Sequence, residues 1–191
     1  NAGVERIRNI SKSLRTFSRK DREQKTKFDI HDGIDSTLLI LKHRTKANGE
    51  RPAVKIVKDY GDIPVVQCYP GQLNQVFMNI LANGIDAFDE ANEGKTYTEI
   101  KANPNSITIR TSVLEEKRVQ IQIPDNGCGM KPETKDRIFE QGFTTKGVGK
   151  GTGLGMAIAH NIITEKHGGT ITCDSQIGVG TTFSIELPTG G

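Results

Sequence analysis

Two glycine clusters within residues 124–155 constrain this chain more than any other feature. The first is Asp125–Gly129 (DNGCG), and the second is Gly149–Gly155 (GKGTGLG). Glycine lets the backbone approach a ligand closely and adopt positive φ angles. The second cluster leads into an apolar helical pattern that includes Leu154 and Ile158, so its unpaired N–H groups lie at a predicted helix N-terminus, which favours anions. The stretch therefore predicts a nucleotide pocket covered by a mobile flap.

A third motif supports a ligand site, because each cluster alone also has a simpler interpretation. Asp-Asn-Gly most often forms a tight turn. Asn79, Asn83 and Asp86, however, lie at i, i+4 and i+7 of a strong amphipathic helix predicted over 72–90. They therefore share one helix face. Polar side chains in this register are costly to bury without partners, which favours a ligand or a metal.

Five motifs, in sequence order, resemble the boxes of the histidine-kinase-type ATPases. They are the Asn box at 79–83, the first Gly box at 125–129, the Phe box at 138–146, the second Gly box at 151–155 and a last Gly box at 178–183. The resemblance is closest to the catalytic and ATP-binding domain of bacterial sensor histidine kinases. It implies a Bergerat-type α/β two-layer sandwich, with a mixed, largely antiparallel sheet, three helices on one face, and ATP between the helices and a lid.

Residue periodicity favours the same fold class. Helices gathered before and between hairpin-like strand pairs favour a two-layer α/β sandwich over a doubly wound sheet. The polar, turn-rich stretch 91–105 is predicted to be an insertion loop. Helices are predicted over 3–20, 32–47, 72–90 and 154–166, and strands over 54–58, 65–69, 106–113, 119–123, 170–174 and 181–187.

The chain is predicted to divide into a helical stub at 1–28, a catalytic domain at 29–188 and a tail at 189–191. The stub has apolar positions Ile7, Ile10, Leu14 and Phe17 in a 3-4-3 spacing that suits a helical seam. By resemblance it is the end of a dimerisation hairpin, which implies a homodimer in the full-length protein. Residues 1–28 carry nine basic and three acidic side chains without interleaved aromatics, so we expect a solvated helix face and no nucleic-acid partner.

Cysteine usage and hydropathy predict a cytoplasmic domain. Cys68, Cys128 and Cys173 stand far apart without metal-ligand spacing, and free thiols suit a reducing compartment. No apolar run is long enough to cross a bilayer. Membrane attachment of a longer parent protein stays open.

The resemblance assigns adenine recognition to the first Gly box. Asp125 is expected to accept a hydrogen bond from the adenine amino group, and Gly127 and Gly129 are expected to let the backbone pass the purine. Thr181 is expected to line the same side.

The phosphates and Mg²⁺ are assigned to the Asn box, the flap and the second Gly box. Asn83 is expected to supply an oxygen ligand to Mg²⁺. Asn79 occupies the position where gyrase and Hsp90 carry a water-activating glutamate, which argues for phosphoryl transfer over hydrolysis. The remaining phosphate-binding candidates are Lys146, Lys150, Gly151, Thr152, Gly153, Leu154 and Gly155.

One position departs from the usual pattern. Many sensor kinases carry a basic residue three positions after the second Asn of the box, whereas this chain has Asp86, and Gly84 stands where the related subgroup has Ala. Asp86 stays a candidate ATP-binding residue, and Lys146 or Lys150 is expected to supply the positive charge at the γ-phosphate.

The expected function is that of an ATP-dependent protein histidine kinase domain. It would transfer the γ-phosphoryl group to a histidine on a dimerisation hairpin outside this chain, with a response regulator as the downstream partner. None of His31, His43, His160 and His167 lies in an acceptor motif, so surface or packing roles are expected for all four. The alternative is a non-catalytic ATP-sensing or interaction module of the same fold.

Overall fold

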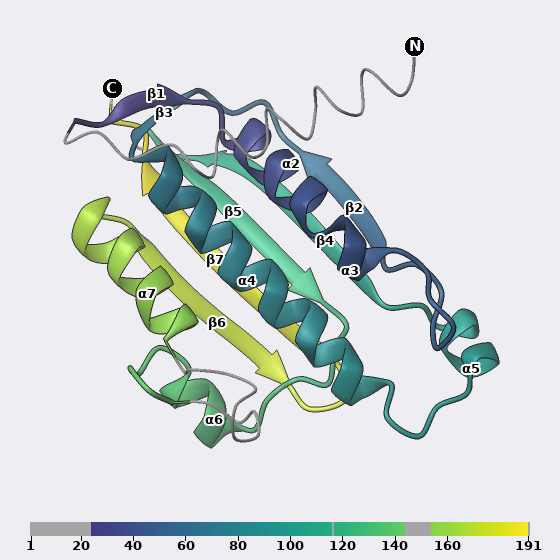
Figure 1. Cartoon of the computed structure of the whole chain (residues 1–191). Coiled ribbons are helices and arrows are strands. Elements are labelled where there is room, and N and C mark those ends of the chain that lie inside the picture. Colours follow the sequence, from purple (N-terminus) through teal and green to yellow (C-terminus); the bar gives the residue numbers. More distant parts are fainter. Residues whose placement is uncertain (1–23, 116, 144–153, 191) are drawn as a thin grey trace, which may run out of the picture.

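A five-stranded sheet forms one layer of the molecule (Figure 1). The structure, a computed structural model, describes residues 24–115, 117–143 and 154–190. The strand order is β2-β4-β5-β7-β6; β2 pairs with β4 in parallel and every other pair is antiparallel. The mixed, largely antiparallel sheet predicted from the sequence is confirmed. Its strands are β2 (Lys55–Tyr60), β4 (Ser106–Leu114), β5 (Arg118–Asp125), β6 (Thr170–Gln176) and β7 (Gly180–Pro188).

Three helices lie across one face of this sheet and form the second layer (Figure 1). The long helix α4 (Pro70–Ala91) lies between α2 (Ile30–Ile40) and α7 (Gly155–Asn161) and packs against both. The short helices α3 (Lys42–Thr45), α5 (Tyr97–Ala102) and α6 (Pro132–Arg137) lie in the connections. Among the helices of the described residues, none combines the length and apolar character needed to span a membrane.

The core lies between the two layers, because strands and helices each bury one face. In β5, Val119, Ile121 and Ile123 are buried and alternate with partly exposed residues, as expected for a sheet with one covered face. Helix α4 begins at Pro70, a favourable first helical position. Its buried apolar residues recur at helical spacing: Leu73, Val76, Phe77, Ile80, Leu81, Ile85 and Phe88.

The N-terminal boundary of this domain differs from the prediction. Thr26–Phe28, assigned to the stub at 1–28, form β1, which pairs antiparallel with β3 (Val66–Cys68) in a second, two-stranded sheet. Asp29 then caps α2 through its side chain, which accepts hydrogen bonds from the N–H groups of His31 and Asp32. Through this pairing and this cap, residues from Thr26 onward pack as part of the folded domain. The predicted seam over 3–20 lies outside the described residues.

The sequence predicted an insertion loop over 91–105, but this stretch also contains a helix. It contains α5, which begins with a capping box between Thr96 and Glu99. Two reciprocal amide hydrogen bonds between Asn92 and Asn105, at 2.8 and 3.1 Å, close the neck of the insertion. The T-x-x-E pattern was present in the sequence, and the polar composition obscured it.

Two predicted helices are each divided in the structure. The 32–47 helix is interrupted at Leu41, where α2 ends and α3 begins. The 154–166 helix is α7 followed by a π-helical turn, η1 (Ile162–Lys166). The side chain of His167 terminates this turn: its Nδ1 lies 2.8 Å from the carbonyl of Ile162, and its Nε2 accepts the N–H of Tyr69 at 3.1 Å.

The predicted tail at 189–191 is also wrong in part. Thr189 is buried and follows directly on β7. Its carbonyl accepts the N–H of Gln67 at 2.9 Å, and its N–H donates to the carbonyl of Lys117 at 2.9 Å. Thr189 thereby joins the small sheet to the β4–β5 turn, a long-range contact that no local pattern encodes.

Deleting residues 189–191 should therefore lower the free energy of unfolding by about 1–3 kcal/mol, because two backbone hydrogen bonds are lost. Urea denaturation measures the change, and a chain lacking only residue 191 is the control. Equal stability of the two truncated chains would show that Thr189 contributes nothing.

Candidate functional site

A row of three side chains on α4 connects the two glycine clusters. At one end, Asn79 Nδ2 donates a hydrogen bond to the carbonyl oxygen of Gly155, the first residue of α7, at 2.8 Å. At the other end, Ala87 packs so closely on Gly127 that a Cβ built on that glycine would lie 2.7 Å from the Ala87 Cβ. Asn83 lies between them, one helical turn from each. Residues from both glycine clusters therefore lie along the same edge of α4.

Asn83 is available to a ligand. Within the part of the chain that the structure describes, its side-chain amide has no hydrogen-bond partner, whereas Asn79 also accepts from Gln75 Nε2 at 2.7 Å. An amide oxygen is a hard ligand of the kind Mg²⁺ takes, usually with only one or two groups from the protein. The described residues hold no cluster of three or more His, Cys, Asp or Glu side chains that could form an all-protein metal site. The donor set thus fits a metal shared with phosphate oxygens.

Asp125 lies at the end of β5, and its carboxyl group is half-buried beside α4. Its Oδ1 accepts the backbone N–H groups of Gly127 at 2.9 Å and Thr181 at 3.3 Å. Its Oδ2 faces Gly84 of α4, where a Cβ would lie 3.3 Å away. Burial raises the pKa of Asp125 from 3.8 to about 6, and the two backbone hydrogen bonds oppose this rise. The Gly84 that departs from the family pattern therefore leaves room beside this carboxyl group.

Asn126, which the sequence analysis did not assign, fixes the turn that presents Asp125. Its Oδ1 accepts the N–H of Ser106 at 2.8 Å, and its Nδ2 donates to the carbonyl of Pro104 at 3.0 Å. These bonds fasten the first Gly box to the end of the insertion. Apart from the Asp-Asn-Gly turn itself, no pattern in the sequence predicts these two hydrogen bonds.

Packing explains why the first Gly box needs Gly129. This residue has φ of 72°, and a Cβ on it would lie 2.0 Å from the carbonyl oxygen of Gln176. The N–H of Gly178 donates to the carbonyl of Cys128 at 2.8 Å. The last Gly box thus holds the first one in place through the β6–β7 turn. The expected role of Gly129 beside the purine stays a prediction.

Thr181 adjoins Asp125, and its expected role in lining the adenine side stays a prediction. Its N–H reaches Asp125, and its Oγ1 lies 2.8 Å from Ser175 Oγ. The neighbouring thiol of Cys128 donates to Glu90 Oε2 at 3.3 Å, and burial together with this carboxylate raises its pKa to about 11. The Cys128 thiol is therefore protonated at neutral pH.

Asp86 has a partner that the sequence did not predict. Its Oδ1 lies 2.6 Å from a terminal guanidinium nitrogen, NH2, of Arg44 on α3, and each side chain is about a third exposed (32% and 30%). Asp86 is one turn from Asn83 on the same face of α4. Asp86, the candidate ATP-binding residue on this face, therefore forms an ion pair with Arg44.

Of the other predicted site residues, some lie within the part of the chain that the structure describes and some do not. Leu154 is exposed and directly precedes α7, and Gly155 begins that helix. The structure thus brings together Asn79, Asn83, Gly155, Asp125, Gly127 and Thr181 around α4. Lys146, Lys150, Gly151, Thr152 and Gly153 lie outside the described residues.

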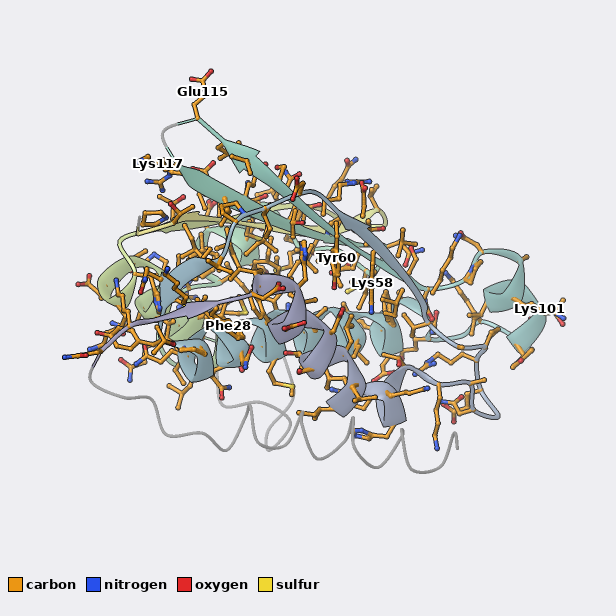
Figure 2. All side chains as sticks on the ribbon, turned by 90° about the horizontal axis from the view of Figure 1, so that it is seen from above. Phe28, Lys58, Tyr60, Lys101, Glu115 and Lys117 are labelled. Carbon is orange, nitrogen blue, oxygen red and sulfur yellow. The ribbon has the colours of Figure 1, made fainter. Side chains whose placement is uncertain are left out.

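Two of the histidines have packing roles. His31 stacks on Tyr60 with ring centroids 4.1 Å apart, and its Nε2 lies 2.7 Å from Thr111 Oγ1. The hydroxyl of Tyr60, labelled in Figure 2, donates to Asp35 at 2.8 Å. Burial and this carboxylate raise the pKa of Tyr60. His167 is buried between η1 and Tyr69.

Comparison with known proteins agrees with this geometry. Residues 68–191 match the model of the histidine kinase-, DNA gyrase B- and HSP90-like ATPase family. The chain is 34% identical over 185 residues to the sensor kinase CckA of Brucella abortus, covering 96% of this chain and 19% of the relative. It is 31% identical over 192 residues to the two-component sensor PprA of Pseudomonas aeruginosa, covering 98% of this chain and 19% of the relative.

The fold matches solved structures as well. The catalytic domain of the histidine kinase ThkA aligns with a TM-score of 0.64 at 22% identity, covering 87% of this chain and 97% of that one. Full-length ShkA in complex with AMPPNP aligns with a TM-score of 0.69 at 21% identity, covering 96% of this chain and 36% of that one.

The chain therefore belongs to the histidine kinase-, DNA gyrase B- and HSP90-like ATPase family, as an ATP-binding domain similar to those of sensor histidine kinases. It spans about a fifth of the length of the sensor kinase CckA and of the two-component sensor PprA.

The raised pKa of Asp125 predicts a cost in stability at neutral pH. Because its pKa is higher in the folded state than in the unfolded one, the folded state binds the proton more tightly. The resulting stabilisation is complete below about pH 4 and is lost as the pH rises through about 6. Asp125→Asn, whose Oδ1 can accept the same two N–H groups, should unfold at pH 7 with a free energy about 1–2 kcal/mol higher than the parent chain.

Urea denaturation at pH 5 and pH 7 measures this difference. Asp59→Asn, an exposed acid paired with Arg110 on the open face of the sheet, is the matched control. A stability gain for Asp125→Asn that does not change between the two pH values would contradict the assigned titration.

Proposed function

We propose that this chain binds Mg²⁺·ATP at the α4 edge and transfers the γ-phosphoryl group to a histidine of a dimerisation hairpin in its parent protein. The observation that carries the proposal is the α4 row, which brings Gly155 of the second Gly box and Gly127 of the first to opposite ends of Asn83. Phosphoryl transfer depends mostly on positioning and charge neutralisation, and the row is suited to both.

Adenine recognition is assigned to Asp125. Its Oδ1 is occupied by two backbone N–H groups, so its Oδ2 is the atom that would accept the adenine amino group. Gly84 leaves the space beside Oδ2 uncrowded. The half-buried carboxyl group makes this contact selective, because a base without the amino donor would leave an acceptor unpaired.

The phosphate end is assigned to Asn83 and the second Gly box. Asn83 would hold Mg²⁺ through Oδ1, and the ion would neutralise charge on the phosphates. Asn79 holds the start of α7, where the amides of Gly151, Gly153 and Gly155 are proposed to meet the phosphates together with Thr152, Leu154 and the cations Lys146 and Lys150.

Asn79 also bears on the type of reaction. An amide cannot accept a proton from water as a carboxylate can, so this position offers no general base for hydrolysis. Its Nδ2 is occupied by Gly155 and its Oδ1 by Gln75. This arrangement supports transfer to an acceptor over rapid hydrolysis.

The remaining components belong to the parent protein. We propose that it is a homodimer joined through that dimerisation hairpin, that this domain works in the cytoplasm, and that a response regulator receives the phosphoryl group. Support comes from similar proteins, which include the histidine kinase ThkA in complex with the response regulator TrrA. That structure aligns with a TM-score of 0.63 at 20% identity, covering 98% of this chain and 48% of that one.

The second candidate is an ATP-sensing module that binds nucleotide without transferring phosphate. The side-chain amide of Asn83 has no hydrogen-bond partner among the described residues, which favours the kinase, because sensing alone does not need a metal ligand. Incubation with labelled ATP and a separately expressed acceptor hairpin from a related kinase distinguishes the two. Acid-labile, base-stable label on the hairpin supports the kinase, and tight ATP binding without label supports the sensor.

Titration calorimetry tests the nucleotide site. Asp125→Asn should weaken Mg²⁺·ATP binding about 10–100-fold, since one buried polar contact is lost. Asn83→Ala should weaken binding in Mg²⁺ more than binding in EDTA. Asp59→Asn, whose side chain lies on the open face of the sheet, should bind like the parent chain. Unchanged affinity in Asp125→Asn would remove this residue from the adenine site.

A further inference from the structure

The polar face of α4 has a marked charge imbalance. Between Pro70 and Ala91 the helix contains Asp86, Asp89 and Glu90 and no lysine or arginine. Asp86 and Glu90 lie along the same face as Asn83, and Asp125 adds a further carboxyl group beside the helix. A triphosphate bound here would meet acidic groups on the helix that is proposed to hold its metal, so it needs positive charge from another element.

Arg44 brings a positive charge to this face. Its guanidinium NH2 lies 2.6 Å from Asp86 Oδ1, and it is the basic side chain that forms an ion pair with α4 among the described residues. Asp86 is three residues from Asn83, and side chains with this spacing are neighbours on a helix surface. A guanidinium has five N–H donors in a planar fork, so the contact with Asp86 leaves donors for a second anion.

The backbone that carries Arg44 is held rigidly. The carbonyl of Arg44 accepts a hydrogen bond from the guanidinium of Arg51, which is 7% exposed. Arg51 also donates to the carbonyls of Lys46 and Pro52, each at 3.1 Å. One buried cation thus binds two carbonyls at the end of α3, those of Arg44 and Lys46, and the carbonyl of Pro52 in the following connection, which fixes the backbone from which the Arg44 side chain extends.

We propose that Arg44 binds the terminal phosphate of ATP and that Asp86 positions its guanidinium for this contact. The inference rests on the proposed function. It assigns the charge that many sensor kinases place on the Asn-box helix itself to a different helix, α3, in this chain. Asp86 is then a positioning residue: its carboxylate draws Arg44 across to the α4 face.

The number of phosphates on the ligand tests this proposal. Affinities of the chain for Mg²⁺·ADP and Mg²⁺·AMPPNP are measured by calorimetry for the parent chain, Arg44→Gln and Arg44→Lys. Arg44→Gln should lose about tenfold in affinity for AMPPNP and much less for ADP, because one charge-assisted contact to the terminal phosphate disappears. Arg44→Lys should lie between, since an ammonium keeps the charge without the fork.

Two double variants separate this role from repulsion by an unpaired Asp86. Arg44→Gln with Asp86→Asn removes both charges and should still discriminate poorly between the two nucleotides. Arg44→Gln with Asp86→Lys returns a cation from α4 and should restore the preference for AMPPNP. Arg110→Gln breaks an ion pair on the open face of the sheet and should change neither affinity.

Each outcome is decisive. Equal losses for ADP and AMPPNP, or no loss, would overturn the proposal and leave the pair as a link between α3 and α4. Failure of the parent chain to bind either nucleotide would instead reject the proposed function. Circular dichroism melting of every variant identifies any that do not fold, and the Asp86→Lys double variant then provides the test, since its recovery of AMPPNP affinity needs a folded domain.

Discussion

The packing of α4 on the sheet is the constraint on which the rest of the structure depends. One side of this helix is buried along its length from Leu73 to Phe88, and it packs against α2 and α7 at its flanks. That burial fixes the rotation of the helix about its axis, because turning it would expose the apolar stripe to water. The polar row from Asn79 to Ala87 is consequently held at a set position between the two glycine clusters. Positioning in this site is thus a by-product of core formation.

The site carries costs that the fold does not need. The half-buried carboxyl group of Asp125 has a raised pKa, so at neutral pH it is ionised in surroundings that disfavour its charge. Gly129 and Gly180 lie so near other backbone carbonyls that any side chain would collide with them. Such features are expected where a protein binds a ligand, since a ligand that pairs with the carboxylate recovers part of the cost.

The Arg44–Asp86 pair shows how one requirement can be met from a different part of the chain. Forty-two positions separate the two residues in sequence, and they meet because α3 lies beside the C-terminal half of α4. Arg51 stabilises the backbone around Arg44 by donating hydrogen bonds to three backbone carbonyls. The departure at Asp86, which in the sequence looks like a missing charge, is in the structure one half of an ion pair.

The sequence by itself determined the local and repetitive features. The order of the motif boxes identified the family, helical spacing located α4 with its buried and polar faces, and alternation located the strands of the sheet. These succeed because they depend on periods of 3.6 and 2 residues, which neighbouring side chains encode. Only the tertiary structure decided the β1–β3 pairing, the packing of Thr189, the hold of Asn126 on the insertion and the partnership of Arg44 with Asp86. Each of these joins segments distant in sequence through a short strand pairing or through one or two side-chain or backbone contacts. Contacts of that kind leave no periodic pattern in either segment.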